Sequence, residues 1–337
     1  MTSDNYIVGT CETMCPVSEV NLRKKNNLVH YFERIEFVKE FSRSAADKRQ
    51  SKASDLRTFG ALKKTLEYLF SRILHETDKP FNFRYDFIFN RCRAVRQEIV
   101  IQNMSCEKTV KLLEPIALFL SFSLYRLTGS PISAFDSSIC GQHLKECLLK
   151  CLTCYEEMDE MDQDYNQDNR IIIEGIYLML NINDPNSLHR LIQLNSTFKS
   201  SPIIKLCIII ALNFHQRNYY KIIRDIQRLP HIICAVATLI LPQLRRNLLY
   251  NFSIAYSSNT STVPLDFLQR LLIYDNTEIL VRDLIELDIQ SKAEEKLTAV
   301  KFNRKTFDKN KTISHTLHQF VEVKFRDLNL TDLILLK

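Results

Sequence analysis

The residues of this 337-residue chain best suited to hold a metal ion are its ten cysteines and eight histidines. Cys11 and Cys15 lie close together near the N-terminus, but no Cys/His pair at ligand spacing follows soon after. A packed N-terminal turn is therefore favoured over a zinc site. Four more cysteines fall on one predicted helix, and a single straight helix cannot surround a tetrahedral ion. Because cysteine is among the most buried residue types, we predict that these four pack in the core: Cys140, Cys147, Cys151 and Cys154.

Two histidines near the C-terminus, His315 and His318, are spaced as neighbours on a helix. No third ligand accompanies them, so a surface pair is favoured over a metal site. The sequence also lacks a phosphate-binding Walker loop, a Gly-x-Ser-x-Gly elbow, a His-Glu-x-x-His motif and paired Cys-x-x-Cys motifs. We therefore predict no metal, no cofactor, no small-molecule substrate and no enzymatic activity.

Three arginines in one segment, Arg91, Arg93 and Arg96, could contact either RNA or buried carboxylates. Arginine is suited to bidentate contacts with carboxylates inside a packed helical array. The structural interpretation is favoured because the segment just before them is aromatic and expected to be half buried, while RNA contact stays the alternative. The aromatic residues are Phe83, Tyr85, Phe87 and Phe89.

The most concentrated positive charge in the C-terminal third lies between residues 292 and 311, with seven basic and three acidic side chains. These cations could bind phosphates, with counterion release driving the association. Phe302 and Phe307 interleave with them and could stack on unpaired bases. The alternative is a charged loop whose two phenylalanines lie in the core. The nucleic-acid-binding candidates are Lys301, Arg304, Lys305, Lys309 and Lys311.

The composition restricts the elements that can position these residues. The chain has only five glycines, which disfavours glycine-rich phosphate loops and an all-β barrel. It has no tryptophan, so its core depends on Phe, Tyr, Leu and Ile. Its 45% hydrophobic residues exclude global disorder. No secretory signal begins the sequence. The longest uncharged apolar stretch, between Arg228 and Arg245, is shorter than the ~18–20 residues of a membrane span. We expect an intracellular protein with reduced thiols, not inserted in a membrane.

The middle of the chain contains one apolar block after another at helical spacing, separated by short polar connectors. Several blocks are apolar nearly all round, which predicts helices buried between neighbours. The seven acidic residues between positions 156 and 168 predict a solvated loop. The pattern predicts a mainly α fold, an array of antiparallel helical hairpins. The blocks are 62–74, 110–127, 140–155, 171–180, 203–214, 219–229 and 232–241.

The last hundred residues differ from this array. Helices are predicted over 244–255, 265–272 and 277–287, and weak alternation predicts strands over 299–302 and 321–325. Three short helices followed by a small β-ribbon is the order of a winged helix. We therefore expect three parts: an N-terminal segment over 1–60, a helical-repeat array over 61–240 and a winged helix over 241–337.

Three ordered sequence blocks resemble the Sac-three/GANP family: Gly9–Pro16, Val38–Asp47 and Arg91–Glu98. Departures are Phe41, Cys92 and Thr58, where the family usually has Tyr, Thr and Pro. The resemblance implies a structural role for the motif residues, a PCI/TPR-like hairpin array and a terminal winged helix. The motif residues are Gly9, Cys11, Met14, Cys15, Pro16, Arg43, Ser44, Ala45, Asp47, Arg91, Arg93 and Arg96.

The same resemblance implies a non-enzymatic scaffold in nuclear messenger-RNA export coupled to transcription. Its implied partners are a PCI-fold subunit, a small acidic subunit and single-stranded RNA or DNA, and its implied location is the nucleus and cytoplasm. The alternative is an adaptor in centrosome duplication and spindle work. The Phe-Gly repeats and centrin-binding helix of large family members are not in this sequence, so pore anchoring and centrin binding are not carried over.

Overall fold

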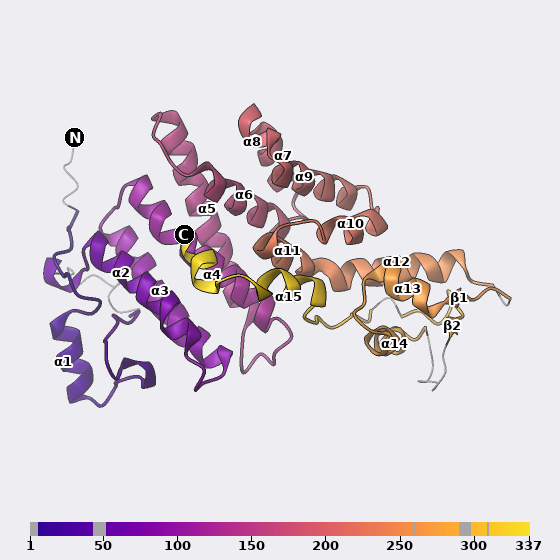
Figure 1. Ribbon diagram of the computed structural model, residues 1–337, viewed down its shortest axis with the longest axis horizontal. Coiled ribbons are helices and arrows are strands. Elements are labelled where there is room, and N and C mark those ends of the chain that lie inside the picture. The colour runs from indigo at the N-terminus through magenta and orange to yellow at the C-terminus, as the bar shows by residue number, and fades with distance from the viewer. Residues whose placement is uncertain (1–5, 43–51, 259, 290–297, 309) are drawn as a thin grey trace. The chain divides into compact units, whose positions relative to one another are not determined.

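A computed structural model of the chain shows a mainly helical protein (Figure 1). It describes residues 6–42, 52–258, 260–289, 298–308 and 310–337. The chain divides into two compact units: unit 1 holds residues 1–123, 138–173 and 329–337, and unit 2 holds residues 124–137 and 174–328. The mainly α prediction is confirmed, whereas the hairpin array, the winged helix and the domain boundaries stay predictions.

Unit 1 consists of helices and short 3-10 turns, and three of its helices, α4, α5 and α6, contribute residues to both units. Its elements are α1 (Val17–Lys25), η1 (Tyr31–Glu33), η2 (Ala53–Asp55), α2 (Phe59–Ser71), η3 (Ile73–His75), α3 (Phe81–Ile101), α4 (Cys106–Leu127), α5 (Ser137–Glu160), α6 (Gln167–Leu180) and α16 (Leu330–Leu335).

Helix α2 shows how the apolar spacing builds the core of unit 1. The hydroxyl of Thr58 accepts a hydrogen bond from the Ala61 N–H at 3.2 Å and so caps the helix. The predicted stripe is buried, with Leu62 fully inaccessible. The C-terminal helix α16 packs against α2, where the Thr331 hydroxyl donates to the Phe70 carbonyl at 2.9 Å. The last residues of the chain are thus part of unit 1.

Helix α5 carries the four central cysteines and buries all of them, as predicted: Cys140, Cys147, Cys151 and Cys154. The prediction of a loop over 156–168 is wrong at both ends. Helix α5 continues to Glu160 and α6 already begins at Gln167. An acidic run can be a solvated helix end as well as a loop, because charged side chains are tolerated on an exposed helical face.

Unit 2 combines helices with one small two-stranded sheet. Its elements are α7 (Pro185–Gln193), α8 (Ser196–Ser200), α9 (Pro202–His215), α10 (Tyr219–Ile226), α11 (His231–Ala237), η4 (Thr238–Ile240), α12 (Leu241–Ala255), β1 (Val263–Pro264), α13 (Leu265–Leu272), α14 (Thr277–Glu286), β2 (Ala299–Val300) and α15 (Gln319–Arg326).

The run from His231 to Ala255 is the most apolar part of unit 2. By length and composition it could cross a membrane, but 61% of its most apolar window is buried inside the protein. Every residue from Ile232 to Ala237 is buried, so α11 is apolar on all sides because it is surrounded. Packing therefore accounts for this run, which also carries Arg245 and Arg246.

Of the two strands predicted in the last hundred residues, the first is confirmed in part and the second is wrong. Val300 pairs antiparallel with Val263, so a strand is present at the start of the 299–302 segment. The strand predicted over 321–325 is wrong, since these residues lie in α15. In this segment apolar residues at 321, 323 and 325 satisfy both a period of two and an i, i+4 spacing. The structure buries Val321 completely and leaves Val323 48% exposed, as a helix requires.

The prediction of a surface pair at His315 and His318 is also wrong. His318 is only 2% exposed and His315 is half-buried, with ring centroids 6.0 Å apart. Within the described part of the chain, the Nε2 atom of each is buried without a hydrogen-bond partner. Burial, and secondarily the Arg245 guanidinium, lowers the pKa of His315 to about 4 and that of His318 to about 3. Both side chains are therefore neutral at physiological pH.

Candidate functional site

The N-terminal motif lies against the segment that precedes α2. The Cys11 N–H donates to the Leu56 carbonyl at 2.9 Å, and the Thr58 N–H donates to the Cys11 carbonyl at 2.8 Å. Gly9 makes the closest approach: a Cβ atom there would lie 2.6 Å from the carbonyl oxygen of Leu56. Only glycine avoids that backbone overlap. Met14, Cys15 and Pro16 are buried.

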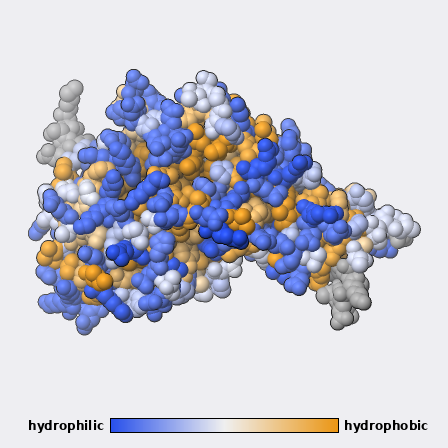
Figure 2. All heavy atoms as spheres, viewed as in Figure 1, coloured by the Kyte–Doolittle hydropathy of each residue, from blue (hydrophilic) through white to orange (hydrophobic). Residues whose placement is uncertain are grey.

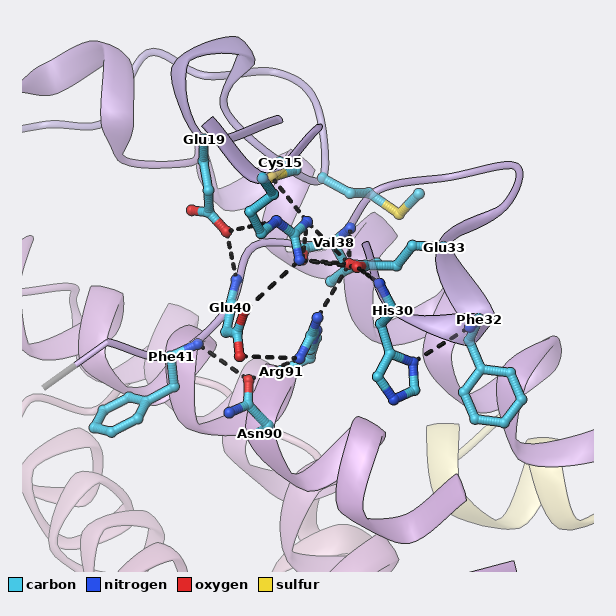
Figure 3. Close-up of polar contacts among 12 residues, drawn as sticks. Cys15, Glu19, His30, Phe32, Glu33, Val38, Glu40, Phe41, Asn90 and Arg91 are labelled. Carbon is cyan, nitrogen blue, oxygen red and sulfur yellow. Dashed lines mark hydrogen bonds and ion pairs between the residues drawn. The ribbon is translucent and has the colours of Figure 1, made fainter. Parts of the chain in front are cut away.

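A buried carboxylate between two arginines forms the centre of the motif region (Figure 3). Glu33 accepts hydrogen bonds from Arg23 at 2.8 Å and from Arg91 at 3.1 Å, and its side chain is fully inaccessible. It also accepts from the Val38 N–H at 3.1 Å. Burial alone would raise the pKa of Glu33, but the two guanidinium groups and this N–H hold it below its usual value. The carboxylate is ionised and serves packing.

Glu40 lies at the rim of this cluster. Its carboxylate is 3.8 Å from both Arg23 and Arg91, and its side chain is 45% exposed. The Glu40 N–H donates to Glu19 at 2.9 Å. The segment after the motif is thereby joined to α1 and α3 at once, as Figure 3 shows. We name the set Arg23, Glu33, Glu40 and Arg91 the first charge cluster.

A second charge cluster, defined by Lys39, Arg57 and Glu98, lies under the motif. Glu98 accepts from Arg57 Nε at 3.0 Å and from the Arg57 backbone N–H at 2.7 Å. The Lys39 ammonium is 3.1 Å from the same carboxylate. Arg57 also donates to the Met14 carbonyl at 3.4 Å, which connects this cluster to the N-terminal motif.

The other two arginines of the third block occupy a more accessible side of α3. The Arg93 guanidinium lies 3.8 Å from the centroid of the Phe41 ring, a cation–π contact. Arg96 forms an ion pair with Glu146 at 2.7 Å and contacts His143. Burial, and then the Arg96 charge, lowers the pKa of His143. All three arginines thus have partners within unit 1, but of these partners the carboxylate of Glu33, at Arg91, is the buried one that the structural interpretation expects.

Of the two motif cysteines, Cys15 lies in an environment that keeps its thiol protonated. Burial raises the pKa of the Cys15 thiol to about 12, while the nearby Arg23 only partly offsets it. Cys11 is half-buried, and its thiol contacts Thr13. In the described ranges, no group of three or more His, Cys, Asp or Glu side chains is arranged to hold a metal ion. The remaining motif candidates, Arg43, Ser44, Ala45 and Asp47, lie outside the described residues.

The basic segment after β2 forms a turn in unit 2. The Thr306 N–H donates to the Asn303 carbonyl at 3.3 Å, and the Lys305 N–H donates to the Asn303 side chain at 2.9 Å. Lys301, Arg304 and Lys305 are exposed. The Lys311 ammonium pairs with Asp288 at 2.7 Å, and Lys309 lies outside the described residues. The turn brings three of the five candidate cations together.

The two aromatic residues of this segment are not available to nucleic-acid bases. Phe302 is 1% exposed and packs against Phe252, with ring centroids 5.6 Å apart. Phe307 is 7% exposed and packs against Tyr250 at 5.3 Å. Stacking on bases is therefore wrong for both residues, because α12 covers their rings. The structure has the alternative predicted from the sequence, with the phenylalanines in the core.

Sequence reasoning missed the acidic partners of the motif. Glu33 and Glu98 stand 58 and 41 residues from their arginine partners Arg91 and Arg57. Glu98 closes the third motif block, and that position was the available signal. Glu33 carries no comparable signal, since it lies in a 3-10 turn of three residues.

The comparison that decides the family covers most of these elements. The sequence model of the SAC3/GANP family matches residues 14–293. The chain belongs to the SAC3/GANP family. Both charge clusters lie inside that match. The basic turn at Lys301–Lys305 lies beyond the matched residues, so the family match says nothing about this turn.

Relatives of this SAC3/GANP chain are much longer proteins. It is 27% identical over 288 residues to "Protein xmas" of Drosophila melanogaster, which covers 79% of this chain and 14% of that protein. It is 27% identical to SAC3 family protein B of Arabidopsis thaliana and 33% identical to SAC3 family protein 1 of Schizosaccharomyces pombe, covering 45% and 36% of this chain. The matches span 10% and 12% of those relatives.

Proposed function

We propose that this SAC3/GANP chain is a non-enzymatic scaffold in nuclear messenger-RNA export coupled to transcription. The family match over residues 14–293 carries the proposal. In this role the chain binds a PCI-fold subunit, a small acidic subunit and single-stranded nucleic acid. The buried charged groups support a scaffold, because Glu33 and Glu98 are each held by arginines and serve packing.

The surface that we propose for the PCI-fold subunit lies on α9 and the adjacent α7. Ile209 and Leu212, one helical turn apart on α9, are 40% and 41% exposed, and Ile192 of α7 is 47% exposed. Helices α7 and α9 pack together, and hydrophobic atoms reach the surface over α9 (Figure 2). Clustered exposed apolar side chains are typical of protein–protein contacts.

We further infer that the end of unit 2 is a winged helix. Its elements follow in the order α12, β1, α13, α14 and β2, and the basic turn comes directly after β2. The antiparallel β1–β2 pair is the start of the β-ribbon that a wing needs. The turn with Lys301, Arg304 and Lys305 is then the wing tip, where exposed cations meet phosphates.

The test is to purify the endogenously tagged protein and to follow its location through the cell cycle. We expect a nuclear pool, a co-purifying PCI-fold subunit and accumulation of polyadenylated RNA in nuclei when the protein is depleted. The double variant I209E/L212E should lose the subunit. The matched variant I254E, at an exposed apolar position of α12 outside the proposed surface, should retain it.

A different set of results would contradict the export role. Signal at spindle poles, with no PCI-fold subunit and no nuclear RNA accumulation, would favour the centrosomal adaptor. Retention of the subunit by I209E/L212E would place its binding surface elsewhere on the chain.

A further inference from the structure

A groove of about 260 Å³ lies between α10 and α13, which pack against each other within unit 2. Residues 220 and 224 of α10 and residue 227, its C-cap, are spaced i, i+4 and i+7, so they form one helical stripe. Residues 267, 270 and 271 of α13 are spaced i, i+3 and i+4 and form another. The two stripes line opposite sides of the groove: Tyr220, Arg224 and Gln227 on one side, Phe267, Arg270 and Leu271 on the other.

Each side of the groove presents an aromatic ring to solvent. Tyr220 is 47% exposed and Phe267 is 42% exposed. Among the described residues, neither ring contacts another ring or a cation, in contrast to Phe302 and Phe307, which the core covers. The contact area of two large side chains is thus left for a ligand, and flat aromatic surfaces favour other planar groups.

The charge around the groove is strongly positive. Two exposed cations line it, and three more exposed cations and two acids lie on or near α10 and α13 in the sequence. The acids are already paired: Asp225 with Arg228 at 3.2 Å and Asp266 with Arg270 at 3.1 Å. Across the described ranges, no ion pair involves Lys221 or Arg224. The cations are Arg217, Lys221, Arg224, Arg228 and Arg270.

The two arginines that line the groove favour the binding of an anion between them. Arg224 and Arg270 line the same small space, and the two nearby acids, Asp225 and Asp266, are paired with Arg228 and Arg270. Like charges that face one space disfavour each other unless an anion lies between them. A phosphate satisfies two guanidinium groups well, because each guanidinium can donate two parallel hydrogen bonds.

We propose that the α10–α13 groove binds a nucleotide unit of single-stranded nucleic acid. Its base stacks on Tyr220 or Phe267, and its phosphate lies at Arg224 and Arg270. An acidic peptide is the less suitable ligand. An acidic segment offers no planar group for the two rings. The proposal rests on the proposed function for nucleic-acid binding, but it adds a site separate from the basic turn.

The experiment measures binding of a fluorescein-labelled fifteen-nucleotide oligouridylate to the full chain at low salt. We expect Y220A/F267A and R224E each to weaken binding at least about tenfold, in line with the energy of base–aromatic stacking. Y220F retains the ring and should bind like the parent protein. R326E makes the same charge change at an exposed arginine of α15 outside the groove and should have a much smaller effect than R224E. Unchanged circular dichroism and melting midpoints verify that the variants fold.

A second measurement identifies the contact directly. Oligouridylate that contains 5-bromouridine should crosslink under ultraviolet light to peptides that contain Tyr220 or Phe267. Parental affinity of Y220A/F267A, or crosslinks confined to other segments, would overturn the groove. Tighter binding of a fifteen-residue polyglutamate than of the RNA, lost in R224E, would assign the groove to an acidic peptide.

The experiments distinguish failure of the groove proposal from failure of the proposed function. If K301E/R304E/K305E weakens RNA binding while the groove variants do not, the groove proposal is wrong and nucleic-acid binding stands. If the parent chain binds no oligouridylate at low salt, both alone and with its PCI-fold partner, both proposals are wrong.

Discussion

Arg57 and Glu98 form a fully buried ion pair, in which Arg57 Nε donates to Glu98 Oε1 at 3.0 Å and both side chains are at most 1% exposed. Neither charge has access to water, so each depends on the other for its solvation. Removing one partner of such a pair leaves the other charge buried and uncompensated. This pair also holds the N-terminal motif, through the hydrogen bond from Arg57 to the Met14 carbonyl.

We therefore expect Glu98→Ala to lower the free energy of unfolding by about 3–5 kcal/mol. Glu146→Ala is the matched control, because it removes a glutamate that pairs with Arg96 while its side chain is 45% exposed. Its cost should be under about 1 kcal/mol. Urea titrations followed by circular dichroism measure both values. Equal effects of the two substitutions would contradict a structural role for the buried pair.

The helical elements were largely predictable because their signals are local. The apolar stripe of α2 and the all-round burial of α11 follow from residue spacing within one segment. The contacts of Glu33 with Arg91 and of Glu98 with Arg57 were not predictable, since the partners lie 58 and 41 positions apart in the sequence. A segment of five residues also cannot separate a strand from a helix when both periods fit, as happened at Val321.

In the candidate site too, features with a local sequence signal were predictable and features that depend on long-range packing were not. The pairing of Arg91 with a buried carboxylate could be predicted, because arginine is suited to such contacts, whereas the contact of Arg93 with the Phe41 ring could not. The burial of His318 could not, because it depends on which helices pack over it. The groove at Tyr220 and Phe267 had a local signal in the spacing of each stripe, but nothing in the sequence places α10 against α13.

Gly9 offers a test of the backbone contact in the motif. In Gly9→Ala the new Cβ would lie 2.6 Å from the Leu56 carbonyl oxygen, so the backbone must shift. We expect a loss of about 1–3 kcal/mol in unfolding free energy. Gly141→Ala is the control, because no atom lies within 4 Å of its Cβ position and it is inside helix α5. That change should stabilise the protein by about 0.5–1 kcal/mol. A neutral Gly9→Ala would mean that the motif is not packed as described.

The buried histidines predict an acid-sensitive stability. His315 and His318 have pKa values of about 4 and about 3 in the folded protein, because burial and Arg245 disfavour their charged forms. In the unfolded chain they titrate near their ordinary pKa of about 6.5. The unfolded state therefore binds more protons as the pH falls below about 6.5, and stability is lost down to the folded pKa values. Each histidine contributes up to about 1.4 kcal/mol per pH unit in that window.

Melting midpoints between pH 7 and pH 4 check this expectation. The double variant H315F/H318F should show a clearly flatter pH dependence than the parent protein. H189Q, which removes an exposed histidine of the same unit, should leave the slope unchanged. Identical slopes for the parent and the double variant would show that other groups cause the acid sensitivity.

The motif cysteines are expected to stabilise by packing and not by metal binding. Substituting both Cys11 and Cys15 by serine should cost about 1–3 kcal/mol in total, mainly through the buried Cys15. The parent protein should contain no stoichiometric zinc, so the double variant should release none. Elemental analysis and urea titration measure the two effects. Stoichiometric zinc that is lost in the double variant would overturn the structural interpretation.

The basic turn after β2 gives the last prediction. Lys301, Arg304 and Lys305 are exposed at one turn, so their charges can reach phosphates together. The triple variant K301E/R304E/K305E should weaken binding of single-stranded RNA, and the parent's affinity should fall steeply with salt as counterions are released. Because these side chains are exposed, the melting midpoint should hardly change. The substitution K311E is a useful comparison, since Lys311 already pairs with Asp288 and should contribute less. If the triple variant binds single-stranded RNA as tightly as the parent at low salt, alone and with the PCI-fold partner, the turn is not the nucleic-acid site.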